Sequence, residues 1–376
     1  MWNFIKKIFI FLIPLGLILV FPLVVFCFSR EYYTTDMIVK AQLKNPEIIC
    51  GKAYGLLGVD YKQRLMIEID PSVVVLGSSR VSKFKKEFFK ESSRFFNFGN
   101  KGNFRSVENF KQFIEELSAN SQIKVILLSL DTNEFVSDVK PLDHSITNAD
   151  NSWKIFIIFL KTGWWRVYDD YFYHKFSWHE LLAKSRQSNN IGLSAIINDS
   201  GHRIDGAYGE SQSNHLENLT ISINDEVAMI NRGSEKPEYG NSISTTTINL
   251  LDQGLQLAKK KNIQVIGFFS PRPSLVWQAF SKQNRLYKNM VSDLPVEVNK
   301  VFLKNNFNFY DFSDLKILNG KETEFSDWLH VTDKMNLRMV IYMAERNKEL
   351  KEYVDIKEAQ RLLEKSKGDF LENASR

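Results

Sequence analysis

The stretch Val73-Val74-Val75-Leu76-Gly77-Ser78-Ser79-Arg80 decides the fold of this chain. Its opening run of three valines and a leucine is typical of a buried strand in a parallel sheet. The strand ends at Gly77, and the apolar spacing of residues 81–89 suits a helix. Open α/β sheets bind their ligands where a strand ends and a helix begins. Ser79 therefore has two interpretations, a residue of a ligand site or an ordinary serine at a helix N-terminus.

The composition limits the classes of function. With 376 residues, the chain is long enough for one large domain or two smaller ones. Its 49 Lys and Arg residues against 44 Asp and Glu residues leave a thin excess of +5, without a basic block that would indicate nucleic-acid binding. Cys27 and Cys50 lack the spacing of metal ligands, and because Cys27 ends an apolar segment we expect no disulfide between them. We predict no metal and no cofactor.

The N-terminal region predicts a membrane anchor. Ile8 to Phe28 is a stretch of 21 residues without a charge, and a helix of that length crosses a hydrocarbon core of about 30 Å. Lys6 and Lys7 precede it, so the short N-terminus is expected in the cytoplasm and the rest of the chain outside. A cleaved signal peptide is disfavoured because its apolar region is usually about 7–15 residues long and ends at a small-residue site.

The remaining patterns divide the chain into four predicted parts. They are the stub and anchor in residues 1–30, a connector in residues 31–71, an α/β domain in residues 72–350 and a charged tail in residues 351–376. We expect the tail to form a peripheral helix that frays. Inside the α/β domain the alternation of strands and helices stops at about residues 140–245, which indicates a large insertion.

Strands and helices alternate on both sides of this insertion. Apolar runs predict strands at residues 94–98, 124–130, 263–269 and 307–312, and amphipathic spacing predicts helices at residues 106–117, 246–261, 275–290 and 332–348. Strands and helices in this order predict an α/β fold with a doubly wound, mainly parallel, five-stranded sheet in a flavodoxin-like three-layer arrangement.

The insertion combines an aromatic part with a polar part. Trp153, Trp164, Trp165 and Trp178 lie in the first part, and residues 205–245 are rich in Gly, Ser and Asn. We expect the insertion to form one wall of a cleft above Ser79, as a lid that binds substrate and excludes water. The alternative is that the tryptophans pack the insertion onto the core, or seat it against a membrane or a partner.

A second motif near the end of the chain strengthens the functional interpretation of Ser79. Asp327-Trp328-Leu329-His330 places a carboxylate three residues before an imidazole, just ahead of a predicted helix. A nucleophilic serine needs a base within hydrogen-bond reach, and the base needs an acceptor on its other nitrogen. One short turn supplies both partners. The other five histidines all lie in the irregular middle of the chain, at positions 144, 174, 179, 202 and 215.

The order of these motifs resembles the SGNH/GDSL hydrolase superfamily, specifically its membrane-anchored, extracytoplasmic branch. The resemblance covers residues 70–135 and 245–345. It implies that Ser79 is the nucleophile, with Ser78 in the place of the family's aspartate, and that Asp327 and His330 are the orienting acid and the base. It also implies that the backbone N–H groups of Ser79 and Gly102 donate to the oxyanion.

One block departs from the family pattern. Where the family has Gly-x-Asn-Asp, this chain has Ser129-Leu130-Asp131-Thr132-Asn133. Asp131 replaces the asparagine that donates to the oxyanion, and an ionised carboxylate there would repel the developing charge. Asn133 is the candidate to take over the donation. The alternatives are a site suited to a different acceptor and a site that has lost its activity.

Three charged residues are further candidates for substrate binding. Arg80, Asp131 and Arg272 each follow the end of a predicted strand. The two arginines could bind a carboxylate or phosphate of the ligand through paired hydrogen bonds. The alternative is a structural ion pair in each case, and for Arg80 the partner would be Asp131.

These observations favour one function and leave a second open. The resemblance implies an extracytoplasmic serine esterase or O-acyltransferase, single-pass in a bacterial cytoplasmic membrane. It would act on a cell-surface polysaccharide or teichoic acid through an acyl-Ser79 intermediate. A membrane-bound O-acyltransferase that supplies the acyl group is the implied partner. The alternative is a catalytically inactive binding or assembly subunit on the same scaffold, which Asp131 favours.

Overall fold

The computed structural model describes residues 2–55, 57, 59–99, 107–118, 120–135, 163–209, 215–232, 242–282 and 292–371. Within these ranges the side chains of residues 2–5, 8–11, 13–15, 17–19, 59, 60 and 215 are not described. The chain forms two compact units. The first contains residues 1–61, 145–204 and 208–211, and the second contains residues 62–144, 205–207 and 212–376.

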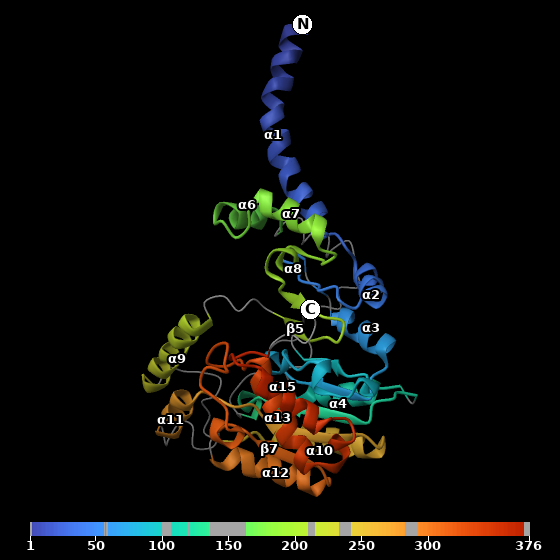
Figure 1. The fold of residues 1–376 in the computed structure, drawn as a ribbon, viewed down its shortest axis with the longest axis vertical. Coiled ribbons are helices and arrows are strands. Elements are labelled where there is room, and N and C mark those ends of the chain that lie inside the picture. The colour runs from blue at the N-terminus through green and yellow to red at the C-terminus, as the bar shows by residue number, and fades with distance from the viewer. Residues whose placement is uncertain are drawn as a thin grey trace. The chain divides into compact units, whose positions relative to one another are not determined.

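A five-stranded, all-parallel sheet lies at the centre of the second unit (Figure 1). In spatial order its strands are β2 (Phe96–Asn97), β1 (Val73–Leu76), β3 (Val125–Ser129), β6 (Gln264–Phe269) and β7 (Asn308–Asp311). Every residue of β1 and β3 is buried, as their continuous apolar runs predict. The α/β class and the five parallel strands of the sequence prediction are therefore confirmed.

Helices cover both faces of this sheet (Figure 1). On one face α10 (Thr245–Lys260) packs against α4 (Val107–Glu116), α12 (Leu294–Lys304) and β6. On the other face alternate strand residues, such as Val73 and Val75, share a core with α9 (His215–Asn231), α11 (Ser274–Lys282) and α13 (Asp333–Arg346). The period of two along a strand explains the arrangement, because successive side chains point to opposite faces. The result is consistent with a three-layer fold.

The segment after β1 differs from the prediction. Instead of one helix over residues 81–89, it forms three 3₁₀ turns, η1 (Ser79–Val81), η2 (Lys86–Phe88) and η3 (Glu91–Ser93). The Asn97 side-chain amide donates hydrogen bonds to the backbone carbonyls of Val81 at 2.7 Å and Phe84 at 3.0 Å. These carbonyls are thus occupied by a side chain from β2. The apolar spacing reflects the burial of Val81, Phe84 and Phe88 rather than a regular helix.

The predicted insertion and connector contain helices that the sequence analysis does not predict. Helix α9 lies within the stretch expected to be polar loop, and its Leu219, Ile223 and Ile230 are buried in the core. Their spacing of four and seven residues fits one helical face, but the Asn, Ser and Thr residues between them weaken the pattern. Helix α3 (Val59–Ile69) likewise occupies part of the expected connector.

The first unit unites residues from the predicted connector and the predicted insertion. It contains α1 (Trp2–Ser29), α2 (Thr35–Lys44), α6 (Trp164–Phe172), α7 (Trp178–Gln187), α8 (Leu193–Asn198) and the antiparallel pair β4 (Gly201–His202) and β5 (Tyr208–Gly209). The buried carboxylate of Glu31 accepts hydrogen bonds from the N–H groups of Ala53 at 2.8 Å and Leu193 at 2.9 Å. Burial raises the pKa of Glu31, and those N–H donors oppose the rise. This carboxylate ties the two sequence-distant segments together.

Helix α1 covers the whole uncharged stretch from Ile8 to Phe28. Near its C-terminal end, Val25 and Phe26 are buried in the core of the first unit, and Phe21 packs against the rings of Tyr171 and Trp178. Among the residues that the structure describes, no helix has both the length and the apolar character needed to cross a membrane.

The C-terminal tail is more ordered than predicted. After α14 (Lys348–Lys351), helix α15 (Ile356–Lys365) packs against α13. Val354, Ala359 and Leu371 are buried in the same core as the sheet. The tail is therefore part of the α/β domain up to residue 371, and residues 372–376 lie outside the described ranges.

The first prediction concerns the glycine at the end of β1. Gly77 has a φ of +152°, and a Cβ atom added there would lie 2.7 Å from the Cβ of Ser129 on β3. We expect Gly77→Ala to lower the free energy of unfolding by about 1–3 kcal/mol, the usual cost of overpacking a closely packed site. Thermal unfolding of the full chain measures the change. Gly368→Ala is the control, because its added Cβ meets no atom within 4 Å. Equal stability of the two variants would contradict the prediction.

Candidate active site

Ser79 lies where the strand order of the sheet reverses. Strand β1 has β2 on one side and β3 on the other, and this switch point is where doubly wound sheets bind ligands. The Oγ of Ser78 accepts a hydrogen bond of 3.4 Å from the N–H of Arg80 and so caps η1. Ser79 is the first residue of η1, which leaves its N–H without a partner in that turn.

The turn that carries His330 is fixed by its own hydrogen bonds. Oδ1 of Asp327 accepts from the N–H groups of Leu329 and His330, both at 2.7 Å, an arrangement that aspartate side chains favour in turns. The N–H of Ser326 donates to the His330 carbonyl at 2.7 Å and closes the loop. Helix α13 follows, with Thr332 as its N-cap.

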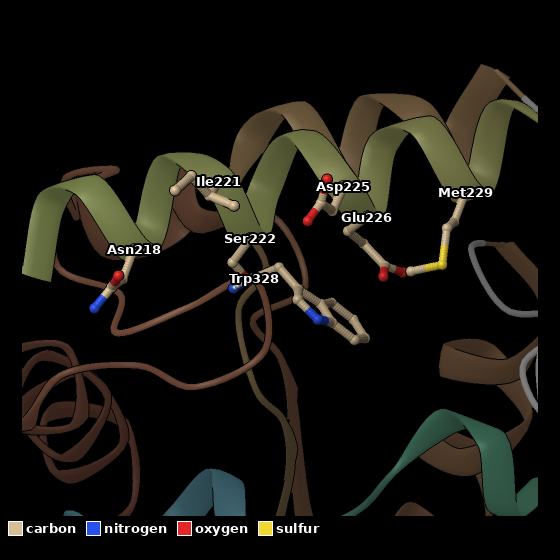
Figure 2. Close-up of a pocket in the computed structure, with 7 residues that line it drawn as sticks. All are labelled: Asn218, Ile221, Ser222, Asp225, Glu226, Met229 and Trp328. Atoms are coloured by element: carbon tan, nitrogen blue, oxygen red, sulfur yellow. Dashed lines mark hydrogen bonds between the residues drawn. The ribbon is translucent and has the colours of Figure 1, made fainter. Parts of the chain in front are cut away.

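A helix of the predicted insertion also holds this turn. The N–H of Trp328 donates to Oγ of Ser222 on α9 at 3.1 Å. The ring of Trp328 lies beside α9, on the side where Ser222 and Glu226 project (Figure 2). One part of the insertion therefore contacts the segment that contains Asp327 and His330. The described tryptophans of the insertion's aromatic part, Trp164, Trp165 and Trp178, belong to the first unit, and Trp153 lies outside the described residues.

The structure brings Ser79, His330 and Asp327 together in one hydrogen-bonded chain. Oγ of Ser79 lies 2.7 Å from Nε2 of His330, although the two residues are 251 positions apart. Nδ1 of His330 lies 2.7 Å from Oδ2 of Asp327. An ionised carboxylate can only accept, so the proton of a neutral imidazole belongs on Nδ1. The lone pair of Nε2 then faces the Ser79 hydroxyl, which is the arrangement a general base requires.

The electrostatics of Asp327 favour this tautomer. Partial burial alone would raise the pKa of Asp327, but its hydrogen bonds with the imidazole and backbone N–H of His330 and with the N–H of Leu329 lower the pKa below its usual value. The carboxylate therefore stays ionised beside the ring. The side chains of His330 and Asp327 are 31% and 38% exposed, which leaves the site open to a substrate.

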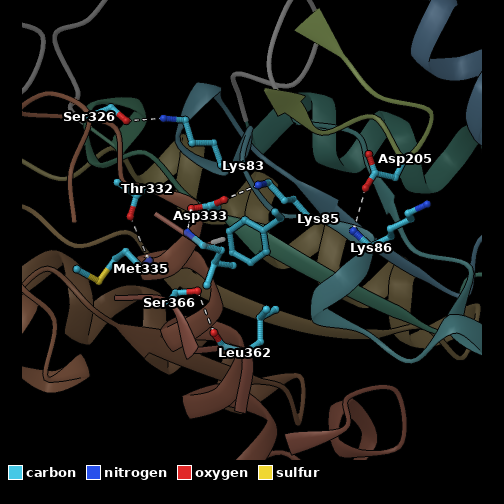
Figure 3. Close-up of polar contacts among 12 residues, drawn as sticks. Lys83, Lys85, Lys86, Asp205, Ser326, Thr332, Asp333, Met335, Leu362 and Ser366 are labelled. Atoms are coloured by element: carbon cyan, nitrogen blue, oxygen red, sulfur yellow. Dashed lines mark hydrogen bonds and ion pairs between the residues drawn. The ribbon is translucent and has the colours of Figure 1, made fainter. Parts of the chain in front are cut away.

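Two lysines join the Ser79 segment to the His330 segment (Figure 3). The ammonium group of Lys83 donates to Oγ of Ser326, and that of Lys85 forms an ion pair with the carboxylate of Asp333. Both acceptors flank the His330 turn in the sequence. Since Lys83 and Lys85 follow Ser79 closely, these bonds hold the nucleophile and the base in register.

Arg80 and Asp131 form an ion pair beside Ser79. Nε of Arg80 lies 3.4 Å from Oδ1 of Asp131, and the arginine side chain is only 6% exposed. Glu134 lies nearby, and burial of its carboxyl group, together with the charge of Asp131, raises the pKa of Glu134 well above its usual value, against the hydrogen bond from the N–H of Val107. The charges of Arg80 and Asp131 offset each other.

The other predicted residues have different positions. Arg272 is 2% exposed, stacks over the ring of Phe280 at 4.8 Å and donates to Oγ1 of Thr132 at 3.2 Å. Its guanidinium is buried between Phe280 and Thr132, and its role in substrate binding stays a prediction. Asn133 lies in η4 (Thr132–Phe135), with no hydrogen bond to Ser79, Asp327 or His330. Gly102 lies outside the described residues.

Sequence reasoning did not find the lysine contacts or Ser222. Lysine is so common on surfaces that neither Lys83 nor Lys85 stands out, and Ser222 lies in a stretch that predicts loop. Within the part of the chain that the structure describes, no group of three His, Cys, Asp or Glu side chains could hold a metal ion. Comparison with known proteins found no matching family model and no similar curated protein.

The second prediction tests the ion pair of Arg80 and Asp131. Arg80→Met leaves a largely buried carboxylate unpaired, so we expect lower stability and a loss of about tenfold or more in activity, equivalent to about 1.4 kcal/mol. Asp131→Asn combined with Arg80→Met removes both charges and should recover much of each loss. Unfolding curves and ester hydrolysis measure the two effects. A double variant no better than Arg80→Met would contradict a charge-compensating pair.

Proposed function

We propose that this protein is a serine esterase or O-acyltransferase of the SGNH type, with Ser79 as nucleophile. The observation that carries the proposal is the hydrogen-bonded chain from Ser79 Oγ through His330 to Asp327. A nucleophile, a base and an acceptor that orients the base are the parts that acyl transfer to serine requires. These residues lie at the switch point of a parallel sheet, where doubly wound folds bind their substrates.

The reaction would proceed in two halves. Nε2 of His330 takes the proton of the Ser79 hydroxyl while Oγ attacks the ester carbonyl, and the same proton then passes to the departing alkoxide. The Asp327 carboxylate stabilises the imidazolium that forms between these steps. In the second half, water or a sugar hydroxyl loses its proton to Nε2 of His330 and attacks the acyl-Ser79 carbonyl. The imidazolium then gives that proton to Oγ as the ester bond breaks, which restores the Ser79 hydroxyl. Water yields a free acid, and a sugar hydroxyl yields a new ester.

Stabilisation of the oxyanion is the step in which this site departs from the family pattern. The N–H of Ser79 is available at the start of η1, and Gly102 and Asn133 are the further donors that the resemblance implies. An isolated carboxylate at Asp131 would oppose the developing charge. The ion pair with Arg80 offsets that repulsion, which supports an active site over a decayed one.

We extend the proposal to location and substrate on the sequence pattern. Residues 1–30 would anchor the chain in a bacterial cytoplasmic membrane, with the α/β domain outside the cytoplasm. The substrate would be an acyl ester on a cell-surface glycan, and a membrane-bound O-acyltransferase would be the partner that supplies acyl groups. The uncharged stretch from Ile8 to Phe28 and the lysines before it support this orientation.

The third prediction tests the nucleophile. A serine-directed fluorophosphonate probe should label the full chain, and Ser79→Ala should abolish labelling because the probe reacts with an activated serine hydroxyl. His330→Ala should reduce the labelling rate by about 10²-fold or more, the usual contribution of a general base. Ser78→Ala is the matched control and should still be labelled. Labelling that persists in Ser79→Ala would show another nucleophile, and an unlabelled wild type would favour the inactive binding subunit.

The fourth prediction tests the anchor. The full chain should fractionate with membranes through an alkaline carbonate wash, because burial of an uncharged 21-residue helix is not reversed by the loss of electrostatic contacts. A reporter that is active only outside the cytoplasm, fused after Arg376, should be active. A protein recovered in the soluble fraction, or with its N-terminal residues removed, would rule out the anchor.

A further inference from the structure

A pocket lies beside the turn that carries the candidate base. It has a volume of about 340 Å³, and it is bounded by one face of α9 and by Trp328 (Figure 2). The α9 residues that line it recur every three or four positions, which is the spacing of one helical face. Those used in the argument below are Asn218, Ile221, Asp225 and Met229. Trp328 separates Asp327 from Leu329 and His330, so the pocket wall and the candidate catalytic turn are one segment.

We propose that this pocket, which is walled by the segment that carries His330, binds a neutral sugar ring of the substrate. The inference rests on the proposed function for its link to catalysis. Trp328 provides a flat apolar face for the C–H side of the ring, and Ile221 and Met229 provide further apolar contact. Asp225 and Asn218 provide a carboxylate and an amide, which bind hydroxyl groups through directed hydrogen bonds.

The anchoring of Trp328 makes the pocket more than a surface depression. Its backbone N–H donates to Oγ of Ser222 on α9 at 3.1 Å, and its side chain packs on the core that contains α13. The ring is therefore held in place before any ligand arrives, which reduces the entropy lost on binding. A sugar that stacks on Trp328 would lie against the same short segment that carries Asp327 and His330.

The charged residues that line the pocket indicate which class of substrate it can bind. Asp225 is exposed and Glu226 also lines the pocket, and among the residues that the structure describes no lysine or arginine lines it. An acidic lining disfavours phosphate groups, because like charges at a binding surface cost free energy. The pocket therefore favours a glycan of neutral sugars over a polyol phosphate such as a teichoic acid.

The fifth prediction tests the pocket by binding, separately from turnover. The full-length Ser79→Ala chain in detergent is titrated with chitotetraose, cellotetraose and poly(glycerol phosphate), followed by saturation-transfer NMR. We expect at least one neutral tetrasaccharide to bind and the polyanion not to bind. Trp328→Ala should weaken binding about tenfold or more, and Trp328→Phe should retain most of it because it keeps an aromatic face. Asp225→Asn should weaken binding several-fold, roughly the value of one charge-assisted hydrogen bond.

A control variant and three outcomes decide the result. Trp165→Ala removes a tryptophan that is 68% exposed in the other unit, and it should bind as the parent does. Failure of both neutral sugars to bind, equal binding of poly(glycerol phosphate), or unchanged binding in a folded Trp328→Ala variant would each overturn the inference. Because Ser79 is absent throughout, an inactive triad cannot produce any of these results.

Discussion

The hydrogen bond between Ser79 Oγ and His330 Nε2 depends on the parallel sheet. In a parallel sheet all strands end at the same edge, so the segments that follow β1 and β7 meet there although 251 positions separate the two residues. The close packing of Gly77 against Ser129 keeps β1 and β3 together at that edge. The bonds from Lys83 to Ser326 and from Lys85 to Asp333 then fix the two segments to each other. Each of these contacts helps to hold Ser79 Oγ at 2.7 Å from His330 Nε2.

The pair of Arg80 and Asp131 shows how a carboxylate that is unfavourable in isolation becomes tolerable in its context. A carboxylate at Asp131 next to a developing oxyanion would slow the reaction. In this chain Arg80, the residue after the candidate nucleophile, pairs with that carboxylate, and burial raises the pKa of the nearby Glu134. The opposite charge of Arg80 at 3.4 Å offsets the charge of Asp131, so this carboxylate is not an isolated charge.

Local sequence patterns predict the strands and helices whose formation depends on residues close together in the chain. The apolar runs of β1 and β3 and the amphipathic faces of α4, α10 and α13 were enough to predict the sheet and most of its helices. The meeting of Ser79 with Asp327 and His330 was expected because a nucleophilic serine needs a base and an orienting acceptor, and because the order of the motifs resembles a known family. The 3₁₀ turns after β1 could not be predicted, because they depend on the Asn97 side chain from another strand. The first unit could not be predicted either, because it depends on the bond between Glu31 and Leu193, which are 162 positions apart in the chain. The burial of Arg272 is of the same kind, because it depends on Phe280 and Thr132.

The central claim is that Ser79 carries an acyl group during turnover. The most direct measurement is peptide mapping by mass spectrometry after the full chain reacts briefly with p-nitrophenyl acetate and is quenched in acid. We predict one acetyl group on the peptide that contains Ser79, located on Ser79 rather than Ser78, and none when Ser79 is replaced by alanine. An acetyl group on another residue, or hydrolysis of the ester with no acetylated peptide at any time after mixing, would contradict the account.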